Sequence, residues 1–286
     1  MEIGIFSKTY EIKTAEETFR CLAEDGIFHT QFNFLNCSLT PTPDEVPEEV
    51  LESIRRASAA YGISIDALTG TFNMIDPDEA AREAGILQFE RQCRWAHALG
   101  IPVVTLCTGS KNPRSKWEWD DRNLEPSSWQ DLRRTTDRLI RFAQDQNVVL
   151  GVETEASNII CTAQKARRFL DETGDPHLKI IMDGANLFHP GETGRMHEIL
   201  DEAFSLLGKD IVIAHAKDLA DSYDLQYAAA GEGCLDFPYY ISLLRRYGYD
   251  GALIMHGLSQ KQAVKSRTFL ENLLQDSERK DYPVGT

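Results

Sequence analysis

Three side chains with metal-binding chemistry lie at the ends of consecutive apolar segments: Glu153 in VVLGVETE, Asp183 in KIIMDGANLF and His215 in IVIAHAKD. A carboxylate inside an apolar segment is costly to bury unless it is paired or bound to a metal. Either carboxylate alone could form a structural salt bridge, and a lone histidine is more often a satisfied core residue. Two carboxylates and one imidazole together suit a divalent ion such as Mn²⁺, Mg²⁺ or Zn²⁺. The sequence therefore predicts a metal site formed by Glu153, Asp183 and His215.

Two further side chains could hold or transfer a proton beside this site. Lys217 follows His215 by two residues, so both lie on the same face of a strand. Its ammonium could bind a substrate oxygen or phosphate, or it could neutralise Glu153 and Asp183, and the sequence leaves both roles open. His256 ends the segment ALIMHGL, and a neutral imidazole can act as a ligand or a base near pH 7. We expect Glu153, Lys217 and His256 to be catalytic.

Shorter polar groups and one aromatic side chain follow other apolar segments. The predicted substrate-binding residues are Asn73, Thr108, Trp117, Asn186 and His189. Amide and hydroxyl groups orient substrate hydroxyls, although each could equally cap a helix or fix a turn. Trp117 lies in the long loop 109–124, where it could stack on a sugar ring, shield the site from water or anchor a surface loop.

The elements that must position these residues alternate along the chain. The predicted strands cover residues 2–6, 28–34, 64–71, 102–107, 148–154, 179–183, 211–217 and 252–256. The predicted helices cover residues 14–23, 48–61, 77–99, 127–146, 162–173, 197–207, 237–247 and 259–274. This alternation predicts a single-domain α/β fold, a (β/α)₈ TIM barrel over residues 1–276, followed by a C-terminal tail over 277–286. An open doubly wound sheet is the alternative, but the turn SKTYEIKTA lacks its glycine fingerprint. In a barrel, the polar residues at the carboxyl ends of the strands converge on one site.

The composition of the chain limits its expected binding partners and its expected cellular location. The 286 residues include 30 Lys and Arg against 45 Asp and Glu, a net charge of −15, which argues against binding to nucleic acid or to an anionic membrane. The amino terminus does not resemble a signal peptide, and the apolar stretches are far shorter than the ~20 residues that span a bilayer. Six cysteines without a C-x-x-C pair indicate a reducing compartment. We expect a cytoplasmic protein with a small-molecule partner, and analogy with other barrels allows a homodimer.

The motifs GTFNM, TLCTGS, GVETE, IIMDGANLF, HAKD, GEG and IMHGL, in this order, resemble the xylose isomerase-like TIM barrel superfamily. That group holds sugar-phosphate isomerases and epimerases and the type-four apurinic endonucleases. The resemblance implies metal ligands on strands five, six and seven, matched by Glu153, Asp183 and His215. It also implies a Glu on strand eight, where this chain has Met255 followed by His256. If Met255 faces the barrel, His256 points outward.

The resemblance and the residues together favour one activity. We expect a metal-dependent isomerase or epimerase acting at a hydroxy-carbonyl centre of a sugar, sugar phosphate or polyol. A lyase or dehydratase acting on a related compound is the nearest alternative, and the missing strand-eight Glu leaves open a sugar-binding barrel without activity. The endonuclease branch has an Asp-x-His before GEG, whereas this chain reads YAAAGEG.

Overall fold

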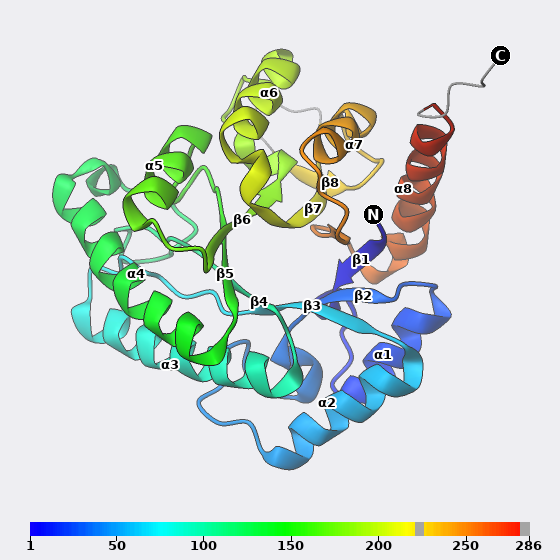
Figure 1. Cartoon of the computed structure of the whole chain (residues 1–286), viewed down its shortest axis with the longest axis horizontal. Helices are drawn as coiled ribbons and strands as arrows, with labels where there is room; N and C mark the ends of the chain where they lie inside the picture. Colours follow the sequence, from blue (N-terminus) through cyan, green and yellow to red (C-terminus); the bar gives the residue numbers. More distant parts are fainter. Residues whose placement is uncertain (221–225, 281–286) are drawn as a thin grey trace.

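The computed structural model describes residues 1–220 and 226–280, with side chains up to residue 276. In these residues eight parallel strands close into a ring, because β1 pairs with both β2 and β9 and β6 pairs with β7. The predicted (β/α)₈ barrel is confirmed (Figure 1). The strands of the ring are β1 (Ile3–Phe6), β2 (His29–Phe32), β3 (Ser64–Thr69), β4 (Val103–Leu106), β5 (Val149–Glu153), β6 (Leu178–Asp183), β7 (Ile211–Leu219) and β9 (Leu253–Met255).

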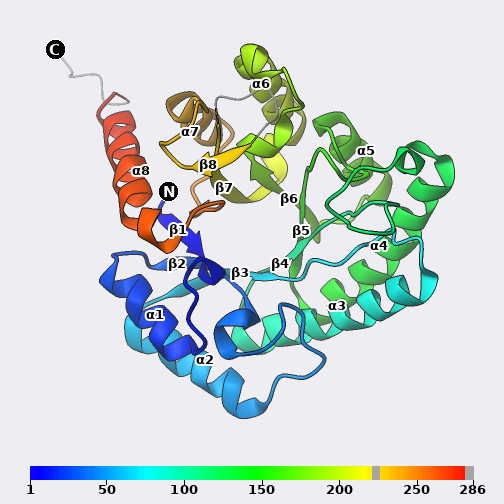
Figure 2. The same ribbon diagram turned by 180° about the vertical axis from the view of Figure 1, so that it is seen from behind.

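An outer layer of α-helices surrounds the strands (Figures 1 and 2). The helices are α1 (Ala15–Glu24), α2 (Glu48–Tyr61), α3 (Glu79–Leu99), α4 (Pro126–Gln146), α5 (Ala163–Thr173), α6 (Met196–Leu207), α7 (Phe237–Arg246) and α8 (Gln260–Lys280). α2 and α3 end where predicted, at Gly62 and Gly100. Both glycines adopt positive φ angles, 66° and 69°, which side chains disfavour.

The last helix is longer than predicted. α8 continues past Leu274 to Lys280, a stretch in which Gln, Glu, Arg and Lys have high helix propensity. It therefore includes the first residues of the predicted tail 277–286, and residues 281–286 lie outside the described part. α8, the last helix of the chain, packs beside β1, the first strand (Figures 1 and 2). None of the described helices is long and apolar enough to cross a membrane.

The short strand β8 (Tyr227–Ala229) is an addition that the sequence analysis did not predict. It pairs antiparallel with the end of β7, from Lys217 opposite Ala229 to Leu219 opposite Tyr227. The buried Asp218 carboxylate accepts hydrogen bonds from four backbone N–H groups, those of Leu219, Gly231, Gly233 and Leu235. This carboxylate fixes the β8 segment, and so Tyr227, beside the carboxyl end of the barrel.

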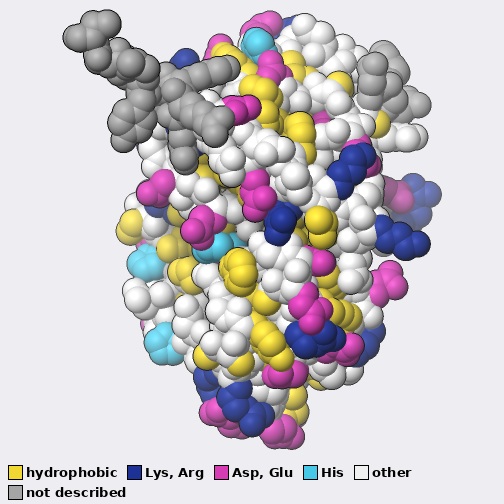
Figure 3. All heavy atoms as spheres, turned by 90° about the vertical axis from the view of Figure 1, so that its right-hand side faces the viewer, with side chains coloured by type: hydrophobic (Ala, Val, Ile, Leu, Met, Phe, Trp, Pro, Cys, Tyr) yellow, Lys and Arg dark blue, Asp and Glu magenta, His cyan; other side chains and the backbone are white. Residues whose placement is uncertain are grey.

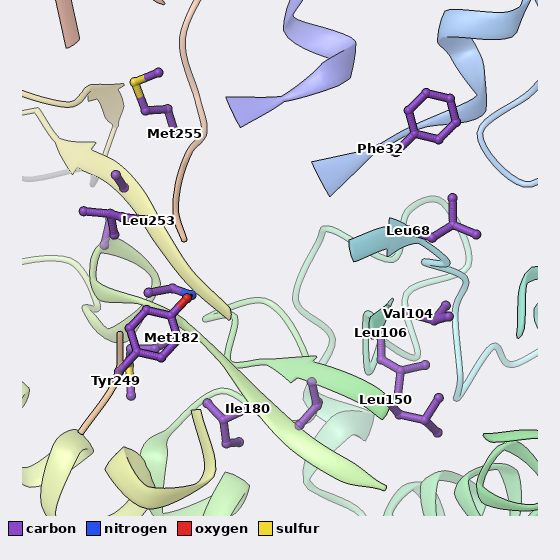
Figure 4. Close-up of a cluster of buried hydrophobic side chains, with 14 of the residues drawn as sticks. Phe32, Leu68, Val104, Leu106, Leu150, Ile180, Met182, Tyr249, Leu253 and Met255 are labelled. Carbon is purple, nitrogen blue, oxygen red and sulfur yellow. The ribbon is translucent and has the colours of Figure 1, made fainter. Parts of the chain in front are cut away.

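Each strand presents alternate side chains to two different cores. The barrel interior contains Phe6, Ala67, Val103, Ile181, Ile213, Ala252 and Ile254. Their neighbours in sequence, such as Leu68, Val104 and Met182, belong to the larger core between the barrel and the helices (Figure 4). The position of a residue in this alternation therefore decides whether it can reach a site inside the barrel.

Surface charges are distributed rather than gathered on the face shown in Figure 3, where acidic and basic side chains are interspersed. Many pair along a helix, such as Arg20 with Glu24 and Arg168 with Glu172, both at 2.6 Å. Exposed pairs of this kind each contribute little to stability.

At the opposite end of the barrel from the strand carboxyl ends, His29 is held between two carboxylates. Its Nδ1 lies 3.0 Å from Asp66 Oδ2, and its Nε2 contacts Glu2. The hydrogen bond to Asp66 outweighs partial burial, and with Glu2 it raises the pKa of His29 above the ordinary 6.5. The folded chain therefore binds a proton on His29 more tightly than the unfolded chain does.

We expect the substitution His29→Asn to destabilise the protein more in acid than in alkali. The stabilisation is fully present below pH ~6.5 and is lost as the pH rises through the raised pKa of the folded state. Urea unfolding at pH 5.5 should show a loss of about 1 kcal/mol, and unfolding at pH 9 a smaller one. In an Asp66→Asn background the difference between the two pH values should shrink. A loss that grows with pH would contradict the assignment.

Candidate functional site

A cavity of about 550 Å³ opens at the carboxyl ends of the strands. Polar and charged groups make up one part of its wall: Lys8, Gln31, Thr69, Thr71, Thr105, Glu153, Glu155, Ser157, Asn186, Lys217 and His256. Phe6, Trp117 and Tyr227 add aromatic surface. A cavity with few convergent charged groups and aromatic walls is the usual form of a small-molecule site.

The alternation of the strands explains which polar residues surround this cavity. Asp183, His215 and His256 each follow a residue of the barrel interior by two positions, namely Ile181, Ile213 and Ile254. Asp183 and His215 are also direct partners across β6 and β7. These residues form a polar layer directly above the apolar filling of the barrel.

Asp183, His215 and His256 bring one ligand atom each to within 4.8 Å of the others. We call these three residues the ligand cluster. Asp183 and His215 are buried, and His256 is partly buried. Among the described residues, Asp183 Oδ2, His215 Nδ1 and His256 Nδ1 are buried atoms that form no hydrogen bond, and Asp183 Oδ2 forms an ion pair with Lys217. Buried polar atoms without a hydrogen bond are rare and costly, so three that face one another fit a bound cation.

His256 points into the barrel, an orientation that the sequence left open. Ile254 lies in the barrel interior, so Met255 faces the helices, where it packs in the outer core near Leu253 (Figure 4). The condition under which His256 would point outward, Met255 facing the barrel, is therefore not met. The His256 ring stacks on Phe6 with centroids 4.4 Å apart and planes inclined by 26°.

Glu153 borders the ligand cluster. Its Oε1 lies 3.5 Å from His215 Nδ1 and accepts a hydrogen bond of 2.6 Å from Asn186 Nδ2. Asn186 in turn accepts a hydrogen bond of 2.5 Å from Lys217 Nζ through its Oδ1. Asn186 thus orients both the carboxylate and the ammonium, and the predicted residues Glu153, Asn186 and Lys217 do lie together.

Lys217 is engaged on several sides. Besides Asn186, its Nζ lies 3.1 Å from Asp183 Oδ2 and 3.8 Å from the centre of the Tyr227 ring. Burial alone would lower the pKa of Lys217, but the carboxylates of Asp183 and Glu153 outweigh burial and raise it. Lys217 therefore stays protonated, which favours the role of neutralising carboxylates over that of transferring a proton.

The two histidines of the cluster have opposite electrostatic environments. Burial, and the cations Lys217 and His215, lower the pKa of His256 to about 4, so its imidazole is neutral at pH 7. Burial also disfavours a charge on His215, but Glu153 and Asp183 raise the pKa of His215 to about 9. Nε2 of His215 donates to Gln31 Oε1 at 3.1 Å, which leaves Nδ1 facing the carboxylates. A cation at this position would replace a proton on Nδ1.

Glu155 lines the same cavity but was not among the predicted site residues. It follows Glu153 by two positions in VETE, so the strand alternation would have identified it. Burial, and then the charge of Glu153, raise the pKa of Glu155 to about 8. Lys8, Gln31 and Tyr227 line the cavity too, and were likewise not predicted.

Three predicted substrate-binding residues lie outside the lining of the cavity. The amide of Asn73 is bound to the backbone of Ser110, because β3 ends at Thr69 and Asn73 lies in the loop beyond it. The hydroxyl of Thr108 is bound to Asn158 and Ile160. His189 interacts with Glu192 through its backbone N–H. Trp117 does line the cavity, with 48% of its surface exposed.

Residues 22–273 match the family model described as xylose isomerase-like TIM barrel. The chain belongs to the xylose isomerase-like TIM barrel family. This match confirms the family that the sequence motifs resemble.

Solved structures with this xylose isomerase-like fold superpose on nearly the whole chain. A D-tagatose 3-epimerase-like protein has a TM-score of 0.78 at 17% identity, covering 99% of this chain and 100% of its own. The apo 3-keto-D-glucoside 4-epimerase YcjR from E. coli has a TM-score of 0.70 at 20% identity, covering 96% and 99%. The IOLI protein with a binding zinc atom has a TM-score of 0.72 at 16% identity, covering 99% and 100%. At these identities the likeness shows the fold.

A curated relative, an uncharacterized protein from Methanocaldococcus jannaschii, is 24% identical over 144 residues. The match covers 49% of this chain and 47% of that protein, so it spans about half the length of each.

In this xylose isomerase-like barrel, the inward-facing residue at the end of the last strand is His256, which directly follows β9. The resemblance implies a Glu as the fourth ligand, from the last strand of the barrel. Here an imidazole takes the corresponding place in the polar layer, beside Asp183 and His215. One oxygen and two imidazole nitrogens, with the Glu153 carboxylate beside them, are donors suited to Mn²⁺ or Zn²⁺.

Proposed function

We propose that this chain is a divalent-metal-dependent isomerase or epimerase that acts at a hydroxy-carbonyl centre of a sugar-like substrate. The observation that carries the proposal is the convergence of three buried ligand atoms that form no hydrogen bond, from Asp183, His215 and His256, next to a cavity bordered by Glu153. The names of similar structures, a D-tagatose 3-epimerase-like protein and a 3-keto-D-glucoside 4-epimerase, support the reaction type.

The ligand cluster and Glu153 would hold the metal, and a bound divalent cation would polarise a substrate carbonyl oxygen. The similar IOLI structure with its zinc atom supports a metal in a barrel of this kind. His256 offers a neutral nitrogen, Asp183 an ionised oxygen, and Gln31 orients the His215 ring. A partner that fixes a ligating histidine is typical of metal sites.

Glu153 is the group we assign to proton transfer at the substrate carbon. Its carboxylate faces the cavity and is oriented by Asn186. A carboxylate in this position removes the proton from the carbon beside the carbonyl group. In an isomerisation it returns this proton to the former carbonyl carbon, while the proton of the adjacent substrate hydroxyl passes to the former carbonyl oxygen. An epimerisation needs a second group to deliver a proton, and Glu155 is the candidate by position because it lines the same cavity.

In this mechanism Lys217 provides a fixed positive charge and does not transfer a proton. Its ammonium lies against Asp183 and Asn186, so it keeps the carboxylates ionised and the Asn186 amide oriented toward Glu153.

The substrate hydroxyls would contact the uncharged polar residues of the cavity wall. There the Thr69 hydroxyl is a buried group without a hydrogen-bond partner among the described residues.

Metal removal combined with proton exchange tests the proposal. The chain is stripped with a chelator, reloaded with Mn²⁺, Zn²⁺ or Mg²⁺, and incubated in D₂O with a panel of ketoses, aldoses and sugar acids. One metal should restore deuterium incorporation at the carbon beside the carbonyl group, with turnover at least about 100-fold above that of the stripped protein.

NMR of the products separates this activity from its alternatives. An isomerase or epimerase gives a product of unchanged composition that carries deuterium, whereas a dehydratase releases water and a lyase splits the substrate. A chain that binds metal and sugars but exchanges no proton across the panel would be a binding protein, and the proposal would be wrong.

A further inference from the structure

The cavity extends beyond the ligand cluster and Glu153. Its volume of about 550 Å³ lies within the range of roughly 300–1,000 Å³ found for sites that enclose drug-sized ligands. The ligand cluster, with the buried Asp183 and His215, lies at its inner end. At the outer end Trp117 and Tyr227 are each 48% exposed. A substrate that fills the cavity therefore has a second end that meets the outer wall.

Lys8 is a charged residue of this outer wall that forms no ion pair with any described residue. It follows β1 directly, in the short helix Ser7–Thr9, and it is exposed at the cavity. In the described part of the chain its Nζ forms no ion pair, and it lies 5.1 Å from the centre of the Phe6 ring. Glu153 and Glu155 attract Lys8 only from beyond ion-pair distance. Its charge is therefore available to a ligand.

A second ammonium reinforces the positive potential at this end. Lys116 and Lys217 both act electrostatically on Lys8. Lys217 is engaged by Asp183 and Asn186, whereas within residues 1–220 and 226–276 Lys116 Nζ donates only to the carbonyl of Thr71, a residue of the cavity wall, and lies over the Trp117 ring. Two ammonium groups that form no ion pair with these residues contrast, at one opening, with the net charge of −15 of the whole chain.

We propose that the substrate carries an anionic group, a carboxylate or a phosphate ester, at the end remote from the reacting carbons, and that Lys8 binds this group at the cavity mouth. This inference rests on the proposed function and names the substrate class of the same site. The phosphate sites frequent in barrels follow strands seven and eight. The site inferred here follows the first strand.

Matched ligand triplets test the inference. Each triplet contains one neutral hexose, its uronate and its terminal phosphate ester, so that charge is the main difference. Calorimetric titration of the Mn²⁺-loaded full chain should give at least about tenfold tighter binding of one anionic member over the neutral sugar. The uronate and the phosphate ester distinguish the two sources of charge. The preference should weaken as NaCl is raised, because a partly exposed ion pair is screened.

Substitutions of Lys8 test whether this residue causes the preference for anionic sugars. Lys8→Met should reduce the preference to within about twofold, and Lys8→Arg should keep most of it, since the charge is retained. Lys209→Met is the control, because Lys209 is an exposed lysine at the amino end of β7, away from the cavity. All three variants should unfold at the temperature of the unmodified chain within a few degrees.

The outcomes separate this inference from the proposed function. Anionic members that bind through Lys8 without any deuterium exchange would support the inference and overturn the isomerase proposal. Deuterium exchange on a neutral hexose, with equal affinity for its uronate and phosphate ester, would overturn only the inference. An anionic preference that survives in Lys8→Met would also overturn it.

Discussion

Replacing Glu153 with glutamine is expected to reduce turnover about 10³-fold or more, the largest effect that the structure predicts on the reaction. The amide keeps the size of the side chain and can still meet Asn186, but it cannot accept a proton from a substrate carbon. It also removes a negative charge 3.5 Å from His215. Because glutamine has nearly the same shape and its amide oxygen can still accept the hydrogen bond from Asn186, the folded structure should persist.

Deuterium exchange and sugar binding, measured on the same preparation, test this prediction. Glu153→Gln should lose exchange while it retains much of the binding of an anionic sugar. Glu155→Gln should lower epimerisation more than isomerisation if Glu155 delivers the second proton. Glu198→Gln is a matched control, since Glu198 is exposed and paired with Arg195. Full exchange in Glu153→Gln would remove this residue from the mechanism.

Replacing His256 with alanine is expected to weaken metal binding about 100-fold, and replacing it with glutamate to preserve most of the affinity. Loss of groups that merely support a ligand already costs about 10–100-fold in metal affinity, so loss of a ligand should cost at least as much. A glutamate at position 256 would place a carboxylate at the inward-facing end of the last strand, one residue after Met255, where the resemblance implies a Glu. Its carboxylate could reach the space shared by Asp183 and His215.

Metal content after dialysis and calorimetric titration with Mn²⁺ and Zn²⁺ measure this effect. His177→Ala is the control, because His177 pairs with Asp175 outside the cavity. If His256→Ala holds metal as tightly as the unmodified chain, the ligands are Glu153, Asp183 and His215 without His256. The ligand cluster would then be the wrong set.

The alternation of strands and helices was sufficient to predict the barrel, because apolar segments and helix-ending glycines recur along the whole chain. The same signal brought Glu153, Asp183 and His215 together correctly, since each ends a segment long enough to show its inward face. The pattern did not predict which way the His256 side chain points. β9 contains only three residues, all apolar, so the sequence offers no contrast between its two faces.

The positions of loop residues could not be read in this way. Asn73 and Thr108 follow their strands closely, but β3 and β4 end earlier than predicted. Gly70 leaves the barrel close to Val104 and Phe89, where a larger side chain would collide. Beyond such a point the path of the chain depends on tertiary contacts, such as that of Asn73 with Ser110. Strand alternation therefore describes residues within strands and, for Glu155 and His256, just beyond them, but it fails in the loops, as for Asn73.

The two-residue period of the barrel strands also limits how such a protein can diverge. Deleting or inserting one residue within β6 or β7 would turn Asp183 or His215 toward the helices and an aliphatic side chain toward the substrate. The inner half of the cavity can therefore be altered during evolution only by exchanging one amino acid for another at a fixed length. The loop 109–124 is not bound to this strand period, so its length can vary among homologues. New substrate preferences should thus arise first at the rim.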